Sequence, residues 1–209
     1  MIKTFVAAFA IVILVAAQAL GRPAVNPAVA KTVENLKAAI TGETTASAKY
    51  AAYAKKAREE GYVQIALLFE AASKAEGIHA ANHRAVAEQM GSPAVQVEPK
   101  FEVKSTRENL DDAIKGESYE VSKMYPDFIK VASAGKANAA LLSFNYAYQT
   151  EQKHKALYVR AAKALNEKQV ETLPTKYLVC TTCGNTYDTD SGARCAICMT
   201  AKDKFITVQ

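Results

Sequence analysis

The sequence predicts an all-α four-helix bundle followed by a small cysteine-rich metal module. Three observations lead to this prediction. Four long segments carry apolar residues at the three- and four-residue spacing of a helix face. Half of the 209 residues are hydrophobic, with many alanines and no tryptophan, which suits packed helices better than a sheet. All four cysteines lie beyond residue 179, in a tail without a helical period.

The first two helices are expected at about 27–60 and 62–90. Asn26 and Pro27 are typical of a helix N-cap and first turn, and Gly61 supplies the stop between the helices. Because the link at Gly61 is short, the two helices should be antiparallel neighbours.

A long extended crossover is expected at 94–104, where valine and glutamate alternate and a proline intervenes. The third helix should begin at Ser105, which can form a capping box with Glu108, and should end near residue 135. The fourth is expected at about 136–168, after another short link. One long crossover in a four-helix bundle is the ferritin-like arrangement.

The two helix pairs resemble each other, since residues 42–79 align with residues 116–154. Each copy starts with a Gly-Glu pair, which contains Glu43 in the first copy and Glu117 in the second. Each copy ends with a Glu-x-x-His motif, after a one-residue insertion in the second. The repeat predicts two similar sets of side chains inside one bundle.

These inward faces carry carboxylates and imidazoles among apolar residues. A glutamate and a histidine three residues apart share one helix face, so both can reach one site. Burying five negative charges without cations would be very costly, whereas two divalent ions nearly neutralise them. Oxygen-rich sites with histidine suit iron or manganese. The candidate ligands of this dimetal site are Glu43, Glu76, His79, Glu117, Glu120, Glu151 and His154.

Each of these residues also has an alternative interpretation in which it is only structural. A single Glu-x-x-His usually lies on a solvated helix face, but two copies in register on apolar seams favour metal binding. His83, one turn beyond His79, is expected to be a packed or hydrogen-bonded core histidine and not an eighth ligand. Tyr50 and Tyr125 either pack in the core or hydrogen-bond an exposed ligand or a bound oxygen species.

The tail contains two C-x2-C knuckles, with eleven residues between them. Each knuckle offers two thiolates to one tetrahedral ion, a stronger interpretation than two disulfides. Zinc and iron both accept four sulfur ligands; zinc would be structural, whereas iron could move single electrons. The candidate ligands are Cys180, Cys183, Cys195 and Cys198.

The N-terminus reads as an export signal, residues 1–19. A short positive start precedes an apolar run, and Ala17-Gln18-Ala19 fits the small-x-small cleavage pattern. The alternative is a retained anchor, for which the run is short compared with the ~20 residues that span a bilayer. We expect a periplasmic protein with no other membrane segment. Acidic and basic residues are interspersed despite the net charge of +5, so nucleic acid is not an expected partner.

Together these motifs resemble the rubrerythrin family over about residues 30–209. The resemblance implies a ferritin-like di-iron domain at 27–170 and a rubredoxin-like domain with an Fe(SCys)4 centre at 175–209. It also implies that the seven candidate bundle ligands, with Tyr50 beside them, reduce hydrogen peroxide to water. Electrons would pass from the Fe(SCys)4 centre to the di-iron centre, in an NADH peroxidase-type chain fed by a redox protein.

Three hypotheses remain to be tested. Glu120 has no counterpart in the first repeat, so one ion could exchange Glu120 for His79 as it changes oxidation state. The 14 residues from His154 to residue 168 span ~21 Å of helix, which would separate one chain's two centres and predicts a head-to-tail homodimer. The rival functions are a ferroxidase or iron-handling protein, and a helical scaffold with a structural zinc ribbon.

Overall fold

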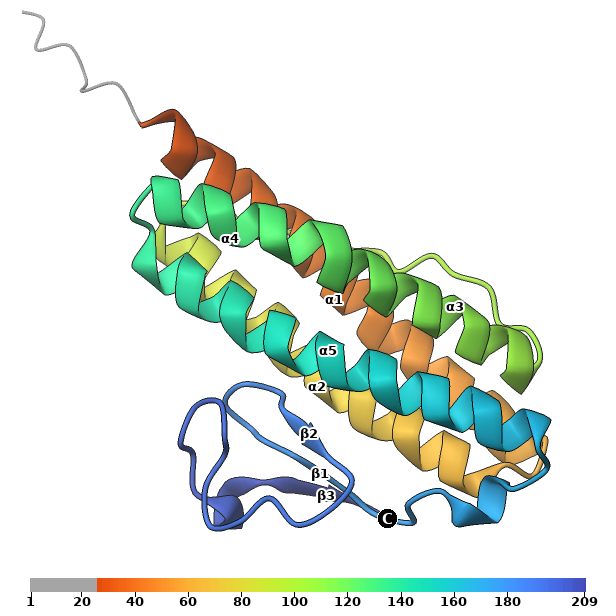
Figure 1. The fold of residues 1–209 in the computed structure, drawn as a ribbon. Helices are drawn as coiled ribbons and strands as arrows, with labels where there is room; N and C mark the ends of the chain where they lie inside the picture. Colours follow the sequence, from red (N-terminus) through yellow and green to blue (C-terminus); the bar gives the residue numbers. More distant parts are fainter. Residues whose placement is uncertain (1–25) are drawn as a thin grey trace, which may run out of the picture.

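The computed structural model describes residues 26–209, in which four long helical rods pack side by side and a small module lies against one flank (Figure 1). The expected export segment, 1–19, lies outside the described residues. Within the described part of the chain, no helix is long and apolar enough to cross a membrane.

The rods lie within two residues of the expected bounds. Asn26 caps the first by accepting a hydrogen bond from the backbone N–H of Ala28. Ser105 and Glu108 form the predicted capping box. The helices are α1 (Pro27–Glu59), α2 (Val63–Gln89), α3 (Thr106–Tyr119), α4 (Tyr125–Ala134) and α5 (Asn138–Asn166).

The arrangement confirms the ferritin-like prediction. Helix α1 packs against α2, and the rod formed by α3 and α4 packs against α5. The crossover at 92–105 contains no helix or strand and runs outside the bundle (Figure 1). Arg84 of α2 donates a 2.6 Å hydrogen bond to the carbonyl oxygen of Val95, which holds the crossover to the bundle.

The third rod is interrupted, which the sequence did not predict. A π-helical turn, Glu120–Met124, separates α3 from α4. Such a turn adds one residue and changes which side chains face inward beyond it. An uninterrupted helix with the spacing of the apolar residues would place Phe128 and Val131 on the inner face, but both are only half-buried, whereas Tyr125 and Ala132 are fully buried.

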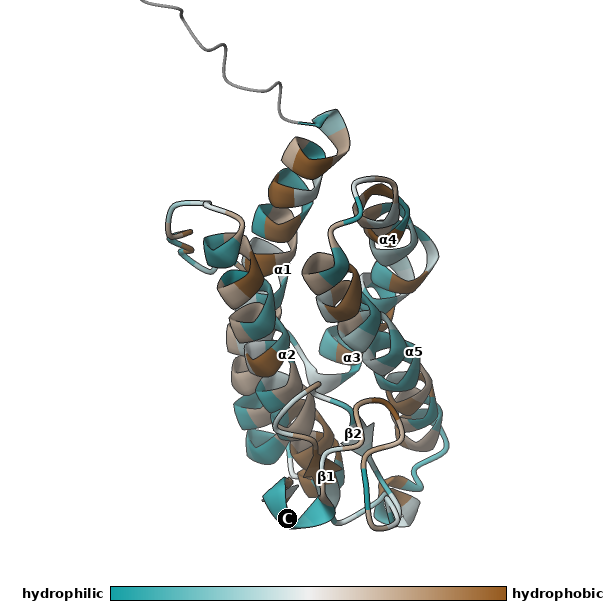
Figure 2. Ribbon diagram, turned by 90° about the vertical axis from the view of Figure 1, so that its left-hand side faces the viewer, coloured by the Kyte–Doolittle hydropathy of each residue, from teal (hydrophilic) through white to brown (hydrophobic). Residues whose placement is uncertain are grey.

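Two apolar clusters fill the bundle and flank a polar layer between them. One contains Phe69 and Tyr158, and the other contains Ile40 and Phe144. Hydrophobic and hydrophilic residues alternate along each rod, as expected for amphipathic helices (Figure 2). The polar layer is therefore enclosed by apolar side chains on both sides.

The tail forms a three-stranded antiparallel sheet in the order β2-β1-β3. Its strands are β1 (Tyr177–Val179), β2 (Thr186–Tyr187) and β3 (Ile206–Val208). The chain reverses after α5, and the module lies along α2 and α5 (Figure 1). Val179 and Val208 join the same apolar cluster as Phe69, so the module is packed onto the bundle of its own chain. The expectation that one chain's two centres lie too far apart is wrong, because the tail folds back.

Candidate metal centre

Six of the seven predicted bundle ligands converge in the polar layer. Their ligand atoms form two groups of four, and within each group all atoms lie within 4.8 Å of one another. Glu76 and Glu151 belong to both groups, so they are placed to bridge two ions. The first group adds Glu43 and His79; the second adds Glu117 and His154. All six side chains are at most 2 % exposed.

The donor atoms fit a pair of metal ions. Buried polar atoms are normally hydrogen-bonded, yet Oε2 of Glu43, Oε2 of Glu117 and both carboxylate oxygens of Glu151 have no hydrogen-bond partner. Nδ1 of His154 lies 3.1 Å from Oε1 of Glu76, but neither atom makes a hydrogen bond. Apart from the 2.9 Å hydrogen bond between Nδ1 of His79 and Oε2 of Glu76, these atoms converge without a shared hydrogen, which is the arrangement that a bound cation satisfies.

The electrostatics also call for cations. Burial, together with the charges of neighbouring glutamates, raises the pKa values of Glu43 and Glu117 well above their ordinary value. Burial opposes ionisation of Glu76 as well, but His154 and His79 outweigh it and lower the pKa of Glu76 to about 2. The layer cannot hold all its carboxylates as anions unless positive charge is supplied.

Both imidazoles are oriented by the cysteine module. Nε2 of His79 lies 3.0 Å from the carbonyl oxygen of Cys183, which can only accept, so this nitrogen carries the hydrogen. Nε2 of His154 lies 2.9 Å from the hydroxyl oxygen of Thr186, whose own hydrogen goes to the carbonyl oxygen of Gly184. In both histidines Nδ1 therefore faces the carboxylates, where it can bind a metal ion in place of a proton.

Two tyrosines form hydrogen bonds between the two repeats. Tyr50 of the first repeat donates a 2.8 Å hydrogen bond to Glu117 of the second. Tyr125 of the second repeat donates a short hydrogen bond to Glu43 of the first. Tyr50 follows its repeat's glutamate by seven residues and Tyr125 by eight. The π turn lies within the longer interval and accommodates the inserted residue, so both tyrosines reach equivalent places.

Glu120 is the seventh candidate ligand and belongs to neither group. Its side chain is half-buried on the π turn, whereas His79 is in place. Burial, followed by the negative charge of Glu43, raises the pKa of Glu120 well above its ordinary value. Among the neighbouring charges, that of Glu43 acts most strongly on Glu120, which lies outside both groups of ligands.

The four predicted cysteines also converge. Their sulfur atoms lie within 4.8 Å of one another, and none is in a disulfide. Sγ of Cys180 lies 3.5 Å from that of Cys198, and the same distance separates Cys183 from Cys195. A hydrogen bond from Cys183 helps to lower the pKa of Cys180 to about 4, while the same contact raises the pKa of Cys183. Four clustered thiols that cannot all ionise unaided fit one tetrahedral metal ion.

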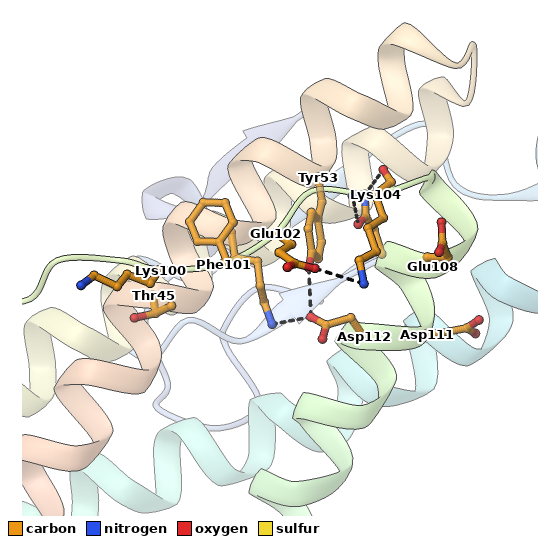
Figure 3. Close-up of a pocket in the computed structure, with 11 residues that line it drawn as sticks. Thr45, Tyr53, Lys100, Phe101, Glu102, Lys104, Glu108, Asp111 and Asp112 are labelled. Atoms are coloured by element: carbon orange, nitrogen blue, oxygen red, sulfur yellow. Dashed lines mark hydrogen bonds and ion pairs between the residues drawn. The ribbon is translucent and has the colours of Figure 1, made fainter.

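A groove of about 480 Å³ lies elsewhere, between the crossover, α1 and α3 (Figure 3). Asp112 pairs with Lys49 at 2.7 Å and accepts a 3.0 Å hydrogen bond from Tyr53. Lys104 pairs with Glu102 at 3.1 Å. None of the six converging ligands lines this groove. Its principal charges are paired with each other, so the groove adds nothing to the metal chemistry.

Comparisons with known proteins agree with this geometry. A family model described as Rubrerythrin matches residues 34–162. Nigerythrin of Nitratidesulfovibrio vulgaris is 39% identical over 182 residues, which cover 85% of this chain and 87% of that protein. The chain belongs to the rubrerythrin family. Rubrerythrin-2 of Clostridium acetobutylicum is 31% identical, over 84% of this chain and 96% of that protein.

A solved structure supports the same assignment. The fully reduced, all-ferrous state of nigerythrin superposes with a TM-score of 0.76 and 38% identity, over 84% of this chain and 86% of that one. As a member of this family, the chain is a di-iron oxidoreductase with a carboxylate- and histidine-bound di-iron site and a rubredoxin-like iron site at its four cysteines.

Sequence reasoning missed three functional contacts. Thr186 and the carbonyl oxygen of Cys183 hold the histidines, and Ser143 bonds to His83. Thr186 and Ser143 do not belong to a recognisable motif. A contact made by a backbone carbonyl, as at Cys183, does not depend on the residue type and cannot be predicted from it. His83 is a hydrogen-bonded core histidine, as predicted.

Proposed function

We propose that this protein is a peroxidase that reduces hydrogen peroxide to two waters, taking two electrons and two protons per peroxide. The di-iron centre supplies the two electrons when iron is bound, and the four-cysteine iron returns them one at a time. One observation carries the proposal: His79 contacts both centres. Its Nδ1 faces the bridging carboxylates, and its Nε2 donates to the backbone of Cys183.

The His79 bridge supports a short electron route. Cys183 is itself one of the four sulfur ligands, so one hydrogen bond joins the cysteine knuckle to the bundle site. A ferroxidase requires the bundle site but has no use for a carrier packed against it. The docked module therefore favours peroxide reduction over iron handling.

The docking contacts support a fixed distance between the centres. Asn82 donates a 2.8 Å hydrogen bond to the carbonyl oxygen of Thr182. Lys153 donates a 2.6 Å hydrogen bond to the side chain of Asn185, and Arg160 pairs with Asp188 at 2.6 Å. These contacts hold the cysteine module against α2 and α5.

Glu120 is proposed to alternate with His79 at the Glu43 end. An additional carboxylate favours a more highly charged ion, whereas a neutral imidazole suits the lower charge. Glu120→Gln should leave the reduced centre intact and impair the oxidised one, a difference that optical spectra of the two states would reveal. Identical spectra in both states would contradict the exchange.

The function is tested by giving the purified, reduced protein either peroxide or dioxygen. The peroxidase proposal predicts faster oxidation of both iron centres by peroxide, with two electrons consumed per peroxide. Preferential reaction with dioxygen together with uptake of added Fe(II) would favour the ferroxidase instead. His79→Ala should slow re-reduction of the di-iron centre while the four-cysteine iron keeps its visible spectrum.

The quaternary arrangement and the location remain proposals. The contact between His79 and Cys183 within one chain removes the sequence-based reason for a head-to-tail homodimer. A cysteine module from a second copy could still occupy the same position if the linker opened. Mixing Cys180→Ser protein with Glu76→Ala protein separates the two arrangements. Recovered activity supports a swapped homodimer; no recovery supports the in-chain route.

We also propose that residues 1–19 direct export, which would require a reductant in the periplasm. Fractionation of cells that express the full chain tests this proposal. Protein confined to the cytoplasm would contradict it.

A further inference from the structure

A buried chain of hydrogen bonds leads away from Glu43. Tyr125 bonds to Oε1 of Glu43, and the hydroxyl oxygen of Tyr125 lies 3.1 Å from Nε2 of His83. Nδ1 of His83 lies 2.7 Å from the hydroxyl oxygen of Ser143. His83 and Tyr125 are completely buried, and Ser143 is 5 % exposed. None of these three side chains belongs to the metal-binding groups.

The direction of each hydrogen follows from chemistry. Glu43 as a metal-binding carboxylate has no hydrogen to give, so the single hydroxyl hydrogen of Tyr125 must point to it. The oxygen of Tyr125 must then accept from Nε2–H of His83. The imidazole is neutral, because its complete burial lowers the pKa of His83 to about 3. Nδ1 is therefore an acceptor, and Ser143 donates to it.

The equivalent place in the other repeat lacks this support. His83 follows His79 by four residues, and Tyr158 follows His154 by four. The ring of Tyr158 lies 5.4 Å from that of Tyr50, but its hydroxyl has no hydrogen-bond partner among the described residues. Tyr50 thus bonds Glu117 without a donor such as His83 behind it. The two ends of an otherwise symmetric centre differ here.

We propose that His83 is a positioning residue that acts through Tyr125. It directs the hydroxyl hydrogen of Tyr125 into a hydrogen bond with Oε1 of Glu43, which leaves Oε2 free for the metal ion. A chain of hydrogen bonds polarises its members, so His83 makes Tyr125 a stronger donor. A stronger donor draws negative charge from Glu43. The ion at that end is then held more readily in its lower oxidation state.

The first test uses protein whose bundle is filled with zinc, a diamagnetic ion that keeps Glu43 a carboxylate, and it does not depend on the proposed peroxidase activity. Long-range ¹H–¹⁵N NMR reports the tautomer of each histidine, and the chain has only three. Loss of one signal in His83→Leu assigns the His83 resonances. We expect hydrogen on Nε2 and a bare Nδ1 at neutral pH. Hydrogen on Nδ1, or a doubly protonated ring, would overturn the proposal.

The second test rests on the di-iron function and measures the midpoint potential of the iron-loaded centre. His83→Leu should lower it, while His83→Gln, which keeps a donor in the Nε2 position, should restore most of the loss. Tyr158→Phe is the matched control, since it removes an unpartnered hydroxyl from the equivalent place and should not move the potential. Equal potentials in wild type and His83→Leu would overturn the proposal even if the protein proves to be a peroxidase.

A third pair of variants guards against misfolding of His83→Leu. Ser143→Ala keeps the core shape but removes the donor to Nδ1, so it should loosen the tautomer preference and lower the potential by less than His83→Leu does. Ser143→Thr retains the hydroxyl and should behave like wild type. If the tautomer of His83 and the midpoint potential are unchanged in Ser143→Ala, Ser143 does not belong to the chain of hydrogen bonds, and the direction assigned to that chain is contradicted.

Discussion

In each of the three histidines of the described chain, Nε2 lies within hydrogen-bond distance of a group outside the metal-binding clusters that can accept its hydrogen. For His79 that group is the Cys183 carbonyl, for His154 it is Thr186, and for His83 it is Tyr125. Metal-binding histidines depend on such partners for orientation and basicity. At the residue scale, the cysteine module is thus part of the di-iron site.

Removing the partner of His154 should weaken metal binding. Thr186→Val keeps the shape but deletes the oxygen that accepts from Nε2–H, and the affinity for iron should fall about 10–100-fold. Thr186→Ser retains the acceptor and serves as the control. Titration of metal-free protein with Fe(II) under anaerobic conditions measures both. Equal affinities in the two variants would show that this contact does not orient His154.

When the bundle is free of metal but the four cysteines keep their ion, stability should depend on pH in a direction set by the bundle ligands. The folded state raises the pKa of Glu43 and Glu117 above 4.5 and that of His154 from 6.5 to about 10. In each case the folded chain holds a proton that the unfolded chain releases. Stability therefore declines as pH rises from about 5 to about 10. Glu76, with a lowered pKa, acts oppositely but only below pH 4.5.

Thermal melts at pH 6 and pH 9 check this prediction. The melting temperature of protein with a metal-free bundle and a loaded cysteine site should be lower at pH 9, and protein with iron in both sites should lose most of that difference, because the bundle ions replace the protons. A higher melting temperature at pH 9 for protein with a metal-free bundle would contradict the assignment of charge in the layer.

At the element scale, the rods were predictable and the break in the third rod was not. Caps and stops are local signals, so Asn26, Gly61 and the Ser105–Glu108 box located three helix ends. The repeat alignment required one inserted residue but did not place it. An extra residue can be accommodated in a loop or within a helix, and only packing around Tyr125 selects the π turn.

Deleting one residue from the π turn should leave Tyr125 in place. Removal of the exposed Ser122 would restore a regular helix in which Tyr125 follows its repeat's glutamate by seven residues, as Tyr50 does. Deletion of Ala48 from α1 is the comparison, because that interval has no π turn to absorb the change and Tyr50 would rotate away from the core. We expect the Ala48 deletion to lower the free energy of unfolding by about 2–5 kcal/mol more than the Ser122 deletion, comparable to truncating a large buried side chain. Chemical denaturation compares them, and equal losses would contradict the role of the π turn in absorbing an inserted residue.

At the scale of the whole molecule, the decisive feature is the return of the tail along the bundle. Gly184 has a φ of +77° and lies directly against His79. A Cβ at this position would collide with Nε2 of His79 and lie 3.2 Å from the carbonyl oxygen of Ala75. Close docking of the knuckle therefore requires a glycine.

Gly184→Ala should undock the module without unfolding it. Gly192→Ala is the matched control, since Gly192 also has a positive φ, +68°, but a Cβ there meets nothing within 4 Å. Both variants carry the backbone cost of ~1–2 kcal/mol. Only Gly184→Ala should slow electron transfer from the four-cysteine iron to the di-iron centre, with the visible spectrum of the former preserved. Stopped-flow measurements that show equal rates would contradict the in-chain contact.

The sequence by itself determined the parts of this protein that depend on spacing. Helix periodicity, the repeated Glu-x-x-His and the paired C-x2-C are local patterns. The two ligand motifs also restrict the bound metal to a few ions. The tertiary structure decided how those parts meet. Glu120 stands apart while His79 is in place, Tyr125 turns inward, and the cysteine module contacts the bundle of its own chain. These outcomes depend on contacts between residues far apart in the chain, often through backbone atoms, and a linear pattern does not encode such contacts.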